Sequence, residues 1–342
     1  MKRYLLIVAM LLAVILTGCS KNEKVDESKS KEEDPPIRIG VSFDSFIIER
    51  WERDRDVFVS TAKEYGAEVN VQNANGDVDE QIAQIEYFIK KKMDVIVIVA
   101  IDADSLSSVV KKAKDEGITV IAYDRLIRNS DVDMYISFDN EAVGRIMGKA
   151  IGEDRSVEKV IMICGSQSDN NVAMVEEGFI PVMEEYNVEI LDKTYCDAWK
   201  AEMGSEYINQ NIELIQQADA IMCGNDDIAT NVIRTLAVNR LAGKTIVVGQ
   251  DADLAACQHI VEGTQRMTVY KPVEKLASEA ARYAVRMSMG NKPETAITIN
   301  DGTYDIPYVA LEPIAVNKNN MDEVIIDSGF HLREDVYLNT TK

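Results

Sequence analysis

The feature that most constrains the fold is a regular alternation of short apolar runs with amphipathic segments. In the first half of the chain, strands are predicted at residues 37–42, 68–72, 95–99, 119–123 and 134–138. Helices are predicted between them at residues 48–65, 79–91 and 105–116. Strands that alternate with helices of this length form a parallel, doubly wound sheet.

The same pattern restarts in the second half of the chain. Strands are predicted at residues 160–164, 188–195, 218–223, 245–249 and 267–270. Helices are predicted at residues 172–185, 201–216, 227–239 and 254–261. About 305 residues follow Pro36, enough for two domains that each have a core. We therefore expect two doubly wound, Rossmann-like α/β domains with a cleft between them.

The first residues resemble an export signal. Lys2 and Arg3 precede an apolar run at residues 4–16 that is too short to span a bilayer. The run ends in Leu16-Thr17-Gly18-Cys19, which is typical of a bacterial lipobox. We predict a signal peptide at residues 1–18 and lipidation of Cys19 on the extracytoplasmic face of the cell membrane. The alternative is an ordinary signal peptide in which Cys19 is incidental.

The segment that follows favours the lipoprotein interpretation. Residues 20–36 contain a single aliphatic side chain, Val25, and cannot pack a core. We predict that residues 19–36 form a lipidated, disordered tether that holds the folded part roughly 20 to 25 Å from the membrane.

Composition excludes several classes of partner. The formal net charge is −21, and removal of Lys2 and Arg3 with the leader makes it −23. Such a surface repels phosphate backbones, so no nucleic acid partner is expected. Beyond Cys19 the cysteines are widely spaced and lack metal-site spacing: Cys164, Cys196, Cys223 and Cys257. We expect them to be buried small hydrophobic residues, with no metal and no cofactor.

Polar residues follow most of the predicted strands. Ligands of open parallel sheets bind outside the carboxyl ends of the strands, so these positions are candidates for a site. In the first half they include Asp44, Arg50, Trp51, Asp124 and Arg125, and in the second half Asp169, Asn171, Trp199, Asn225, Asp251 and Lys271. Carboxylates, amides and guanidinium groups satisfy hydroxyls, and an indole face covers the C–H side of a sugar ring.

Several of these residues have a purely structural explanation. An aspartate at a helix start is commonly an N-cap, which accounts equally well for Asp227 and Asp253. A turn or cap is the better interpretation of residues 139–140. Arg125 could pair with the preceding carboxylate, and Trp51 could be a core residue of the first helix.

Longer motifs carry a resemblance to a known family. They are Ile37-Arg-Ile-Gly-Val, Glu49-Arg-Trp-Glu-Arg-Asp-Arg-Asp56, Val71-Gln-Asn-Ala-Asn-Gly76, Ala122-Tyr-Asp-Arg125, Tyr135-Ile-Ser-Phe-Asp-Asn-Glu141, Gly249-Gln-Asp-Ala-Asp-Leu254 and Met267-Thr-Val-Tyr-Lys-Pro272. The chain resembles the D-xylose-binding proteins of bacterial ABC sugar importers, from about Ile37 to His331. It departs from them at Phe46-Ile47 and at residues 176–192.

The resemblance implies a type I periplasmic binding fold that closes on one pentose. Three hinge crossings are expected, near residues 138–140, 269–271 and 297–300. The N-terminal lobe would then comprise residues 37–139 and about 271–298, and the C-terminal lobe residues 140–270 and about 299–342. The implied ligand-binding residues are Arg50, Trp51, Asp124, Arg125, Asp169, Asn171, Trp199, Asn225, Asp251 and Lys271.

The expected function is capture of D-xylose, or a close monosaccharide, and presentation of the closed form to the membrane permease of an ABC importer. The alternative within binding proteins is a xylose sensor that docks on a membrane histidine kinase. A carbohydrate-active enzyme is a distant alternative, since the two histidines, His259 and His331, lie in no catalytic motif. A transcription regulator would need a DNA-binding segment where the leader stands.

Overall fold

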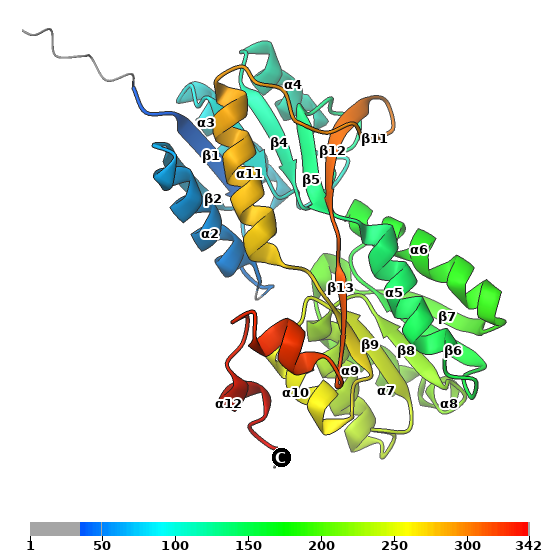
Figure 1. Cartoon of the computed structure of the whole chain (residues 1–342). Helices are drawn as coiled ribbons and strands as arrows, with labels where there is room; N and C mark the ends of the chain where they lie inside the picture. The colour runs from blue at the N-terminus through cyan, green and yellow to red at the C-terminus, as the bar shows by residue number, and fades with distance from the viewer. Residues whose placement is uncertain (1–34, 49, 341–342) are drawn as a thin grey trace, which may run out of the picture. The chain divides into compact units, whose positions relative to one another are not determined.

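The computed structural model describes residues 35–48 and 50–340. The predicted signal peptide, Cys19 and almost all of the predicted tether lie outside the described residues. Within the described ranges, no helix combines the length and the apolar character needed to cross a membrane. Residues 36–342 form one compact unit, which contains two lobes (Figure 1).

The first lobe is built on a seven-stranded sheet with the order β11-β12-β5-β4-β3-β1-β2. Its strands are β1 (Arg38–Phe43), β2 (Glu68–Asn73), β3 (Val95–Ile98), β4 (Thr119–Tyr123), β5 (Met134–Phe138), β11 (Thr298–Asn300) and β12 (Asp305–Leu311). All neighbours are parallel except β11 and β12. The central strand β3 reads Val-Ile-Val-Ile and is buried throughout, as a parallel strand covered on both faces requires.

Helices cover both faces of this sheet. One face packs against α2 (Arg50–Glu64) and α11 (Val273–Ser288), and the other against α3 (Val78–Lys90) and α4 (Ser107–Asp115). The two layers are separate apolar clusters, so the first lobe has a core on each side of its sheet.

The second lobe repeats the plan with a six-stranded sheet of order β13-β10-β9-β8-β6-β7. Its strands are β6 (Lys159–Cys164), β7 (Glu189–Tyr195), β8 (Ala220–Cys223), β9 (Ile246–Gln250), β10 (Met267–Tyr270) and β13 (Ile314–Asn317). Only β13 is antiparallel to its neighbour. The predicted fold class, two doubly wound α/β lobes, is therefore confirmed.

The helices of the second lobe also form two layers. One face carries α5 (Asn140–Gly152) and α6 (Asn170–Tyr186), and the other α7 (Glu202–Gln210), α8 (Ile212–Ile215) and α9 (Asp226–Val238). A third apolar cluster joins α10 (Leu254–Glu262), the π-helical turn η2 (Asp322–Ile326) and α12 (Arg333–Val336). The predicted helix at 201–216 is thus two helices, which meet at Asn211.

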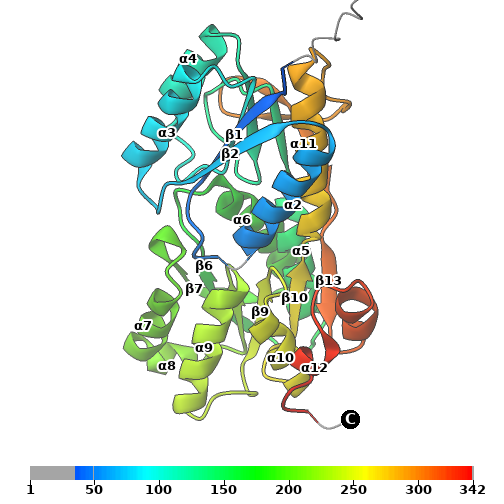
Figure 2. The same cartoon turned by 90° about the vertical axis from the view of Figure 1, so that its left-hand side faces the viewer.

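The chain passes between the lobes at three points. It crosses from β5 to α5, from β10 to α11, and from β12 to β13 (Figure 2). The third crossing was expected near residues 297–300, and this prediction is wrong. Strand β12 pairs in parallel with β5, with Tyr308 opposite Tyr135, so residues 305–311 belong to the first sheet and the chain crosses after Leu311.

Helices α5 and α6 pack unusually closely, and α5 was not predicted. A Cβ atom on Gly144 of α5 would lie 2.0 Å from the carbonyl oxygen of Val175, and one on Gly178 of α6 would lie 2.0 Å from that of Glu141. Glycine is therefore required at both positions, because the two backbones touch. Three glycines lower the intrinsic helix propensity of residues 140–152, and tertiary packing overrides this preference.

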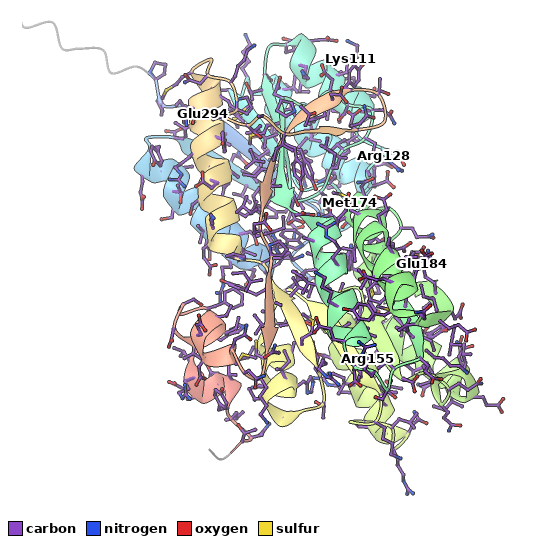
Figure 3. All side chains as sticks on the ribbon, turned by 45° about the vertical axis from the view of Figure 1, so that its right-hand side comes forward. Lys111, Arg128, Arg155, Met174, Glu184 and Glu294 are labelled. Atoms are coloured by element: carbon purple, nitrogen blue, oxygen red, sulfur yellow. The ribbon has the colours of Figure 1, made fainter. Side chains whose placement is uncertain are left out.

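Charged side chains are exposed on both lobes. Lys111, Arg155, Glu184 and Glu294, which Figure 3 labels, are examples. By contrast, Cys164, Cys196, Cys223 and Cys257 are buried, as the sequence predicted.

Candidate functional site

The carboxyl ends of the strands face each other across the two lobes and enclose one polar cavity. All ten residues implied by the resemblance line it: Arg50, Trp51, Asp124, Arg125, Asp169, Asn171, Trp199, Asn225, Asp251 and Lys271. Ile48, Asn140 and Gln250 line it as well. The enclosed volume is only about 20 Å³, roughly the room that one water molecule needs. The lobes are therefore closed, and the lining side chains fill the space between them.

Arg50 lies at the start of α2 between two carboxylates. Its Nη2 atom is 2.8 Å from Oδ2 of Asp124 and 3.2 Å from Oδ1 of Asp54. Burial opposes the charge on Arg50, but these neighbours outweigh it and raise its pKa. Burial likewise disfavours ionisation of Asp124, and Arg50, Lys271 and Arg125 together lower its pKa instead. Both groups therefore remain charged inside the protein.

Arg125 joins the two lobes electrostatically. Its Nη1 atom lies 2.7 Å from Oδ2 of Asp44 in the first lobe, and its Nε atom lies 2.8 Å from Oδ2 of Asp169 in the second. Nη1 also donates to the carbonyl oxygen of Ala100. The ion pairs of Arg125 are thus with Asp44 and Asp169, whereas Asp124 pairs with Arg50.

Asn171 adds hydrogen bonds across the same boundary. Its Nδ2 atom donates to the backbone oxygen of Asp124 at 3.0 Å, and its Oδ1 atom accepts from the hydroxyl of Tyr135 at 3.1 Å. The preceding Asp169 accepts from the backbone N–H of Asn171 and so caps α6 as well as binding Arg125. One short segment at the start of α6 therefore provides two residues of the cavity.

The two tryptophans lie on opposite lobes. Trp51 is buried and packs edge-on against Phe43, so it is a core residue that also lines the cavity. Trp199 lies directly on Gly165, where an added Cβ would come within 2.3 Å of the indole ring. Both indole N–H groups are buried without a hydrogen-bond partner among the described residues.

The remaining polar wall comes from β8, β9 and β10. Asn225 caps α9 by accepting from the N–H of Ile228, and Lys271 lies 2.7 Å from Oδ1 of Asp251 and donates to Gln250 at 3.0 Å. Gln250 in turn donates to the carbonyl oxygen of Gly224. Gln250 was noted among the polar residues at strand ends but was not included in the ten predicted ligand-binding residues, although its position at the carboxyl end of β9 is the same signal that identified Asp251.

The helix-cap interpretations have mixed outcomes. Asp139 caps α5 by accepting from the N–H of Ala142, as expected. The next residue, Asn140, lines the cavity, so treating it as only a turn or cap was wrong. Asp227 lies in the first turn of α9 behind its cap, and Asp253 occupies the N-cap position of α10.

Three cavity residues have a backbone conformation that non-glycine residues rarely adopt. The φ angles of Asp124, Trp199 and Asp251 are 64°, 59° and 103°. Such conformations persist where the surrounding structure enforces them, and they concentrate at functional sites. No pattern in the sequence signals them, because none of these residues is glycine.

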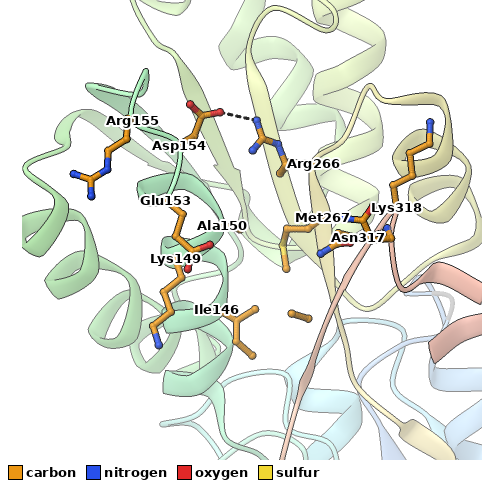
Figure 4. Close-up of a pocket in the computed structure, with 12 residues that line it drawn as sticks. Ile146, Lys149, Ala150, Glu153, Asp154, Arg155, Arg266, Met267, Asn317 and Lys318 are labelled. Carbon is orange, nitrogen blue, oxygen red and sulfur yellow. Dashed lines mark hydrogen bonds and ion pairs between the residues drawn. The ribbon is translucent and has the colours of Figure 1, made fainter. Parts of the chain in front are cut away.

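A larger cavity lies on the outer side of the second lobe. It has a volume of about 750 Å³ and is lined by the end of α5 and by residues next to β10 and β13 (Figure 4). Its lining includes the exposed side chains of Lys149, Arg155 and Lys318 and an exposed ion pair between Asp154 and Arg266. The cleft between the lobes has the buried, convergent polar groups typical of a binding site, and this groove does not.

The described residues contain no cluster of three or more His, Cys, Asp or Glu side chains arranged to hold a metal ion. Neither histidine lines the cleft cavity. His259 lies on α10, and Nε2 of His331 is 2.8 Å from the carbonyl oxygen of Ala252.

Comparison with known proteins places the chain in a family. The model of the periplasmic binding protein domain matches residues 39–292. The D-xylose-binding periplasmic proteins of Haemophilus influenzae and Escherichia coli are 41% and 40% identical to it, over 88% of this chain and 92% of each relative.

Solved structures of solute-binding proteins have a fold similar to that of this chain. An ABC transporter solute-binding protein from Clostridium phytofermentans with bound β-D-glucose is 29% identical, with a TM-score of 0.79 over 87% of this chain and 99% of that one. A carbohydrate transporter solute-binding protein from Chloroflexus aurantiacus in complex with D-glucose is 26% identical, with a TM-score of 0.81 over 87% and 97%. The chain therefore belongs to the periplasmic binding proteins, a family of extracytoplasmic solute-binding proteins with two α/β domains.

Proposed function

We propose that the protein captures D-xylose, or a monosaccharide closely similar to it, in the cleft and presents the closed form to the permease of an ABC importer. The observation that best supports this proposal is that residues far apart in the sequence come together in one place. Ten residues implied by resemblance to D-xylose-binding proteins, spread from Arg50 to Lys271, all line one buried cavity. Relatives that are 40–41% identical are named for binding D-xylose.

The chemistry of the cavity suits a small polyol. Carboxylates of Asp124, Asp169 and Asp251 accept hydrogen bonds, while Arg50 and Lys271 donate them. A sugar hydroxyl does both, so it can enter between the members of an ion pair without leaving either unsatisfied. The tryptophan faces supply apolar cover for the C–H side of the ring.

Closure couples binding to shape. Because the closed cavity has room for about one water molecule, the lobes must separate and the lining side chains must move aside for a sugar to bind. The cavity walls come from both lobes, so a ligand completes its contacts only when they close again. Binding then shifts the equilibrium toward the closed form, which a membrane partner can distinguish.

We further propose that Cys19 carries a lipid anchor on the outer face of the cell membrane. Its support is the lipobox-like sequence before Cys19. Labelling of cells with a palmitate analogue should mark the wild-type protein and leave Cys19→Ala unmarked. Equal labelling of the two would contradict the assignment.

Titration calorimetry on a soluble form that begins after the predicted tether tests the pocket. Trp199→Ala and Asp251→Ala should each weaken D-xylose binding by at least about tenfold, because each removes a cavity wall or a buried acceptor. Asp115→Ala, on the exposed face of α4, is the control and should bind as the parent does. If both cavity variants bind normally, the pocket is wrongly assigned, and a panel of pentoses and hexoses identifies the preferred sugar.

The membrane partner is identified by co-purification from solubilised membranes with and without D-xylose. Recovery of a permease and its ATPase, favoured by the closed form, is the expected result. Recovery of a histidine kinase instead would replace import with sensing. Release of xylose from xylosides would show that the protein is an enzyme and overturn the proposal.

A further inference from the structure

The turn that carries Asp251 into the cleft is backbone-strained. Asp251 and Ala252 follow β9 directly, and their φ angles are 103° and 58°. Neither residue is glycine, so two consecutive positions adopt the left-handed region that side chains disfavour. A turn of this kind keeps its shape only when its surroundings hold it there.

Specific hydrogen bonds hold this turn from behind. The N–H of Asp251 donates to the carbonyl oxygen of Val269, and the N–H of Ala252 donates to Oγ1 of Thr268 at 3.1 Å. The N–H of Asp253 donates to Oδ2 of Asp226 at 3.2 Å. Three successive backbone amides are therefore satisfied, and the third bond leads to a side chain on another element.

Asp226 is the common end of this network. The hydroxyl of Thr268 donates its only proton to Oδ2 of Asp226 at 2.6 Å, which leaves the Thr268 oxygen free to accept from Ala252. Gln265 donates to Oδ1 of Asp226 at 2.9 Å. Asp226 thus fixes the amide of Asp253 directly and that of Ala252 through Thr268.

The position of Asp226 separates it from the cavity itself. It is fully buried at the first residue of α9 and does not line the cavity, although its neighbour Asn225 does. Its carboxylate lies against the backbone of Gly249, where an added Cβ would come within 2.3 Å of Oδ1. The carboxyl group therefore sits behind the end of β9, immediately before the strained turn.

We propose that Asp226 is a positioning residue that holds the Asp251–Ala252 turn, so that the carboxylate of Asp251 points into the cleft. The proposal rests on the proposed function in that the cavity is taken to be the sugar site. The hydrogen bonds that fix the turn form in the protein without ligand, so their effect on the turn can be measured separately from sugar binding.

Hydrogen exchange of single amides tests the hold without any sugar. In Asp226→Ala, the amides of Ala252 and Asp253 should exchange at least about tenfold faster than in the parent, while the amides of β8 keep their protection. In Thr268→Val, only the Ala252 amide should lose protection, because Asp226 still accepts from Asp253. The matched control is Asp227→Ala on the same helical turn, which should leave both amides unchanged.

Calorimetry with D-xylose then tests the consequence for the site. Asp226→Ala should weaken binding by at least about tenfold, whereas Asp226→Asn should stay within about threefold of the parent. The Asn carbonyl can accept from Thr268 and Asp253. Its amide can donate to Oε1 of Gln265 once the Gln265 amide turns over, because Nε2 of Gln265 faces this position in the parent. If Asp226 merely supported the fold, Asp226→Asn would not restore binding while faster exchange in Asp226→Ala stayed confined to the amides of Ala252 and Asp253.

The outcomes are distinguishable. If the parent binds no sugar, the proposed function fails, and the exchange rates still decide whether Asp226 holds the turn. If both amides stay protected in Asp226→Ala and Thr268→Val, the inference is overturned. It is also overturned if Asp226→Ala binds D-xylose as tightly as the parent. Should Asp226→Ala not fold, Thr268→Val provides the same test for Ala252.

Discussion

The two lobes present most of their cavity residues by different physical means, although Asp124 of the first lobe also has a left-handed φ angle and Asp251 of the second also pairs with Lys271. In the first lobe, the guanidinium groups of Arg50 and Arg125 are each held between two buried carboxylates. In the second lobe, Trp199 and Asp251 stand on left-handed turns whose amides are fixed by hydrogen bonds.

This difference shows that one cavity can be preorganised in two ways. Charge pairing fixes long side chains on regular elements, and its loss exposes an unpaired buried charge. A strained turn fixes the backbone itself, and its loss releases strain. Substitutions in the first lobe should therefore cost more stability than substitutions in the turns of the second.

The largest expected effect is in the first lobe. Arg125→Met leaves Asp44 and Asp169 buried without their cation and should destabilise the protein by about 3 to 5 kcal/mol in urea denaturation. Arg128→Met is the control, because its partner Asp104 is exposed and such pairs contribute at most about 1 kcal/mol. Similar losses from the two variants would contradict the idea that buried pairing braces the first lobe.

The stability of the protein should depend on pH through Asp226, which holds the Asp251–Ala252 turn of the second lobe. Burial raises the pKa of Asp226, and the nearby charge of Asp251 adds to this effect, although hydrogen bonds from Thr268 and Gln265 oppose it. The folded protein therefore binds the Asp226 proton more tightly than the unfolded chain does, so stability falls as pH rises above about 4, the usual pKa of an aspartate in an unfolded chain.

Asp226→Asn removes this dependence. Its stability relative to the wild type should increase by more than about 1 kcal/mol between pH 5 and pH 8, measured by urea denaturation. A stability difference that does not change with pH would show that Asp226 is ionised throughout this range. Ser108→Ala, at an exposed position, removes no titratable group and is the comparison, so its stability difference from the wild type should not change with pH.

The strain itself can be tested at Ala198, which precedes Trp199. Ala198 is exposed and has a φ angle of 51°, so Ala198→Gly should raise the free energy of unfolding by up to about 1 kcal/mol. Ala237→Gly, at an exposed position in α9, should lower it by about 0.5 to 1 kcal/mol. The same Ala→Gly change is therefore expected to raise the free energy of unfolding at one position and to lower it at the other. A loss of stability in both variants would rule out strain at Ala198.

The smallest effect concerns a contact between the lobes. The hydroxyl of Ser168 donates to the carbonyl oxygen of Ile101 at 3.2 Å, beside a backbone bond from Ala103 to Ser168. Ser168→Ala should weaken sugar binding about two- to fivefold, since one hydrogen bond of the closed form is lost. Calorimetry on Ser168→Ala and on the exposed control Ser108→Ala checks this. Tighter binding by Ser168→Ala would mean that the contact opposes closure.

Local periodicity predicted most of the fold. The strands at 119–123, 134–138 and 267–270 have the predicted bounds, because apolar runs of this length bounded by turns have few other solutions. The third crossing was misplaced because the pairing of β12 with β5 is a long-range contact that no local pattern encodes. Helix α5 was missed because its glycines serve packing against α6.

The residues that line the cavity were predicted more completely than the residues that hold them in position. Family motifs identified the ten lining residues, since their side chains are the chemistry that the motifs preserve. Neither the φ angle of Asp251 nor the hydrogen bonds that Thr268 and Gln265 make to Asp226 could be predicted, because nothing in the sequence distinguishes Thr268 and Gln265 from other residues in or next to a strand. Asp44, the partner of Arg125, was noted only as one polar strand end among many.

The close contact of α5 with α6 has a mechanical consequence. Helix α5 begins at the first crossing, and α6 begins at Asn170, between Asp169 and Asn171, which bind the opposite lobe. Because their backbones touch at Gly144 and Gly178, the two helices have little freedom to slide. They form one rigid unit, so a rotation at the first crossing carries Asp169 and Asn171, and with them this wall of the cavity, without lag.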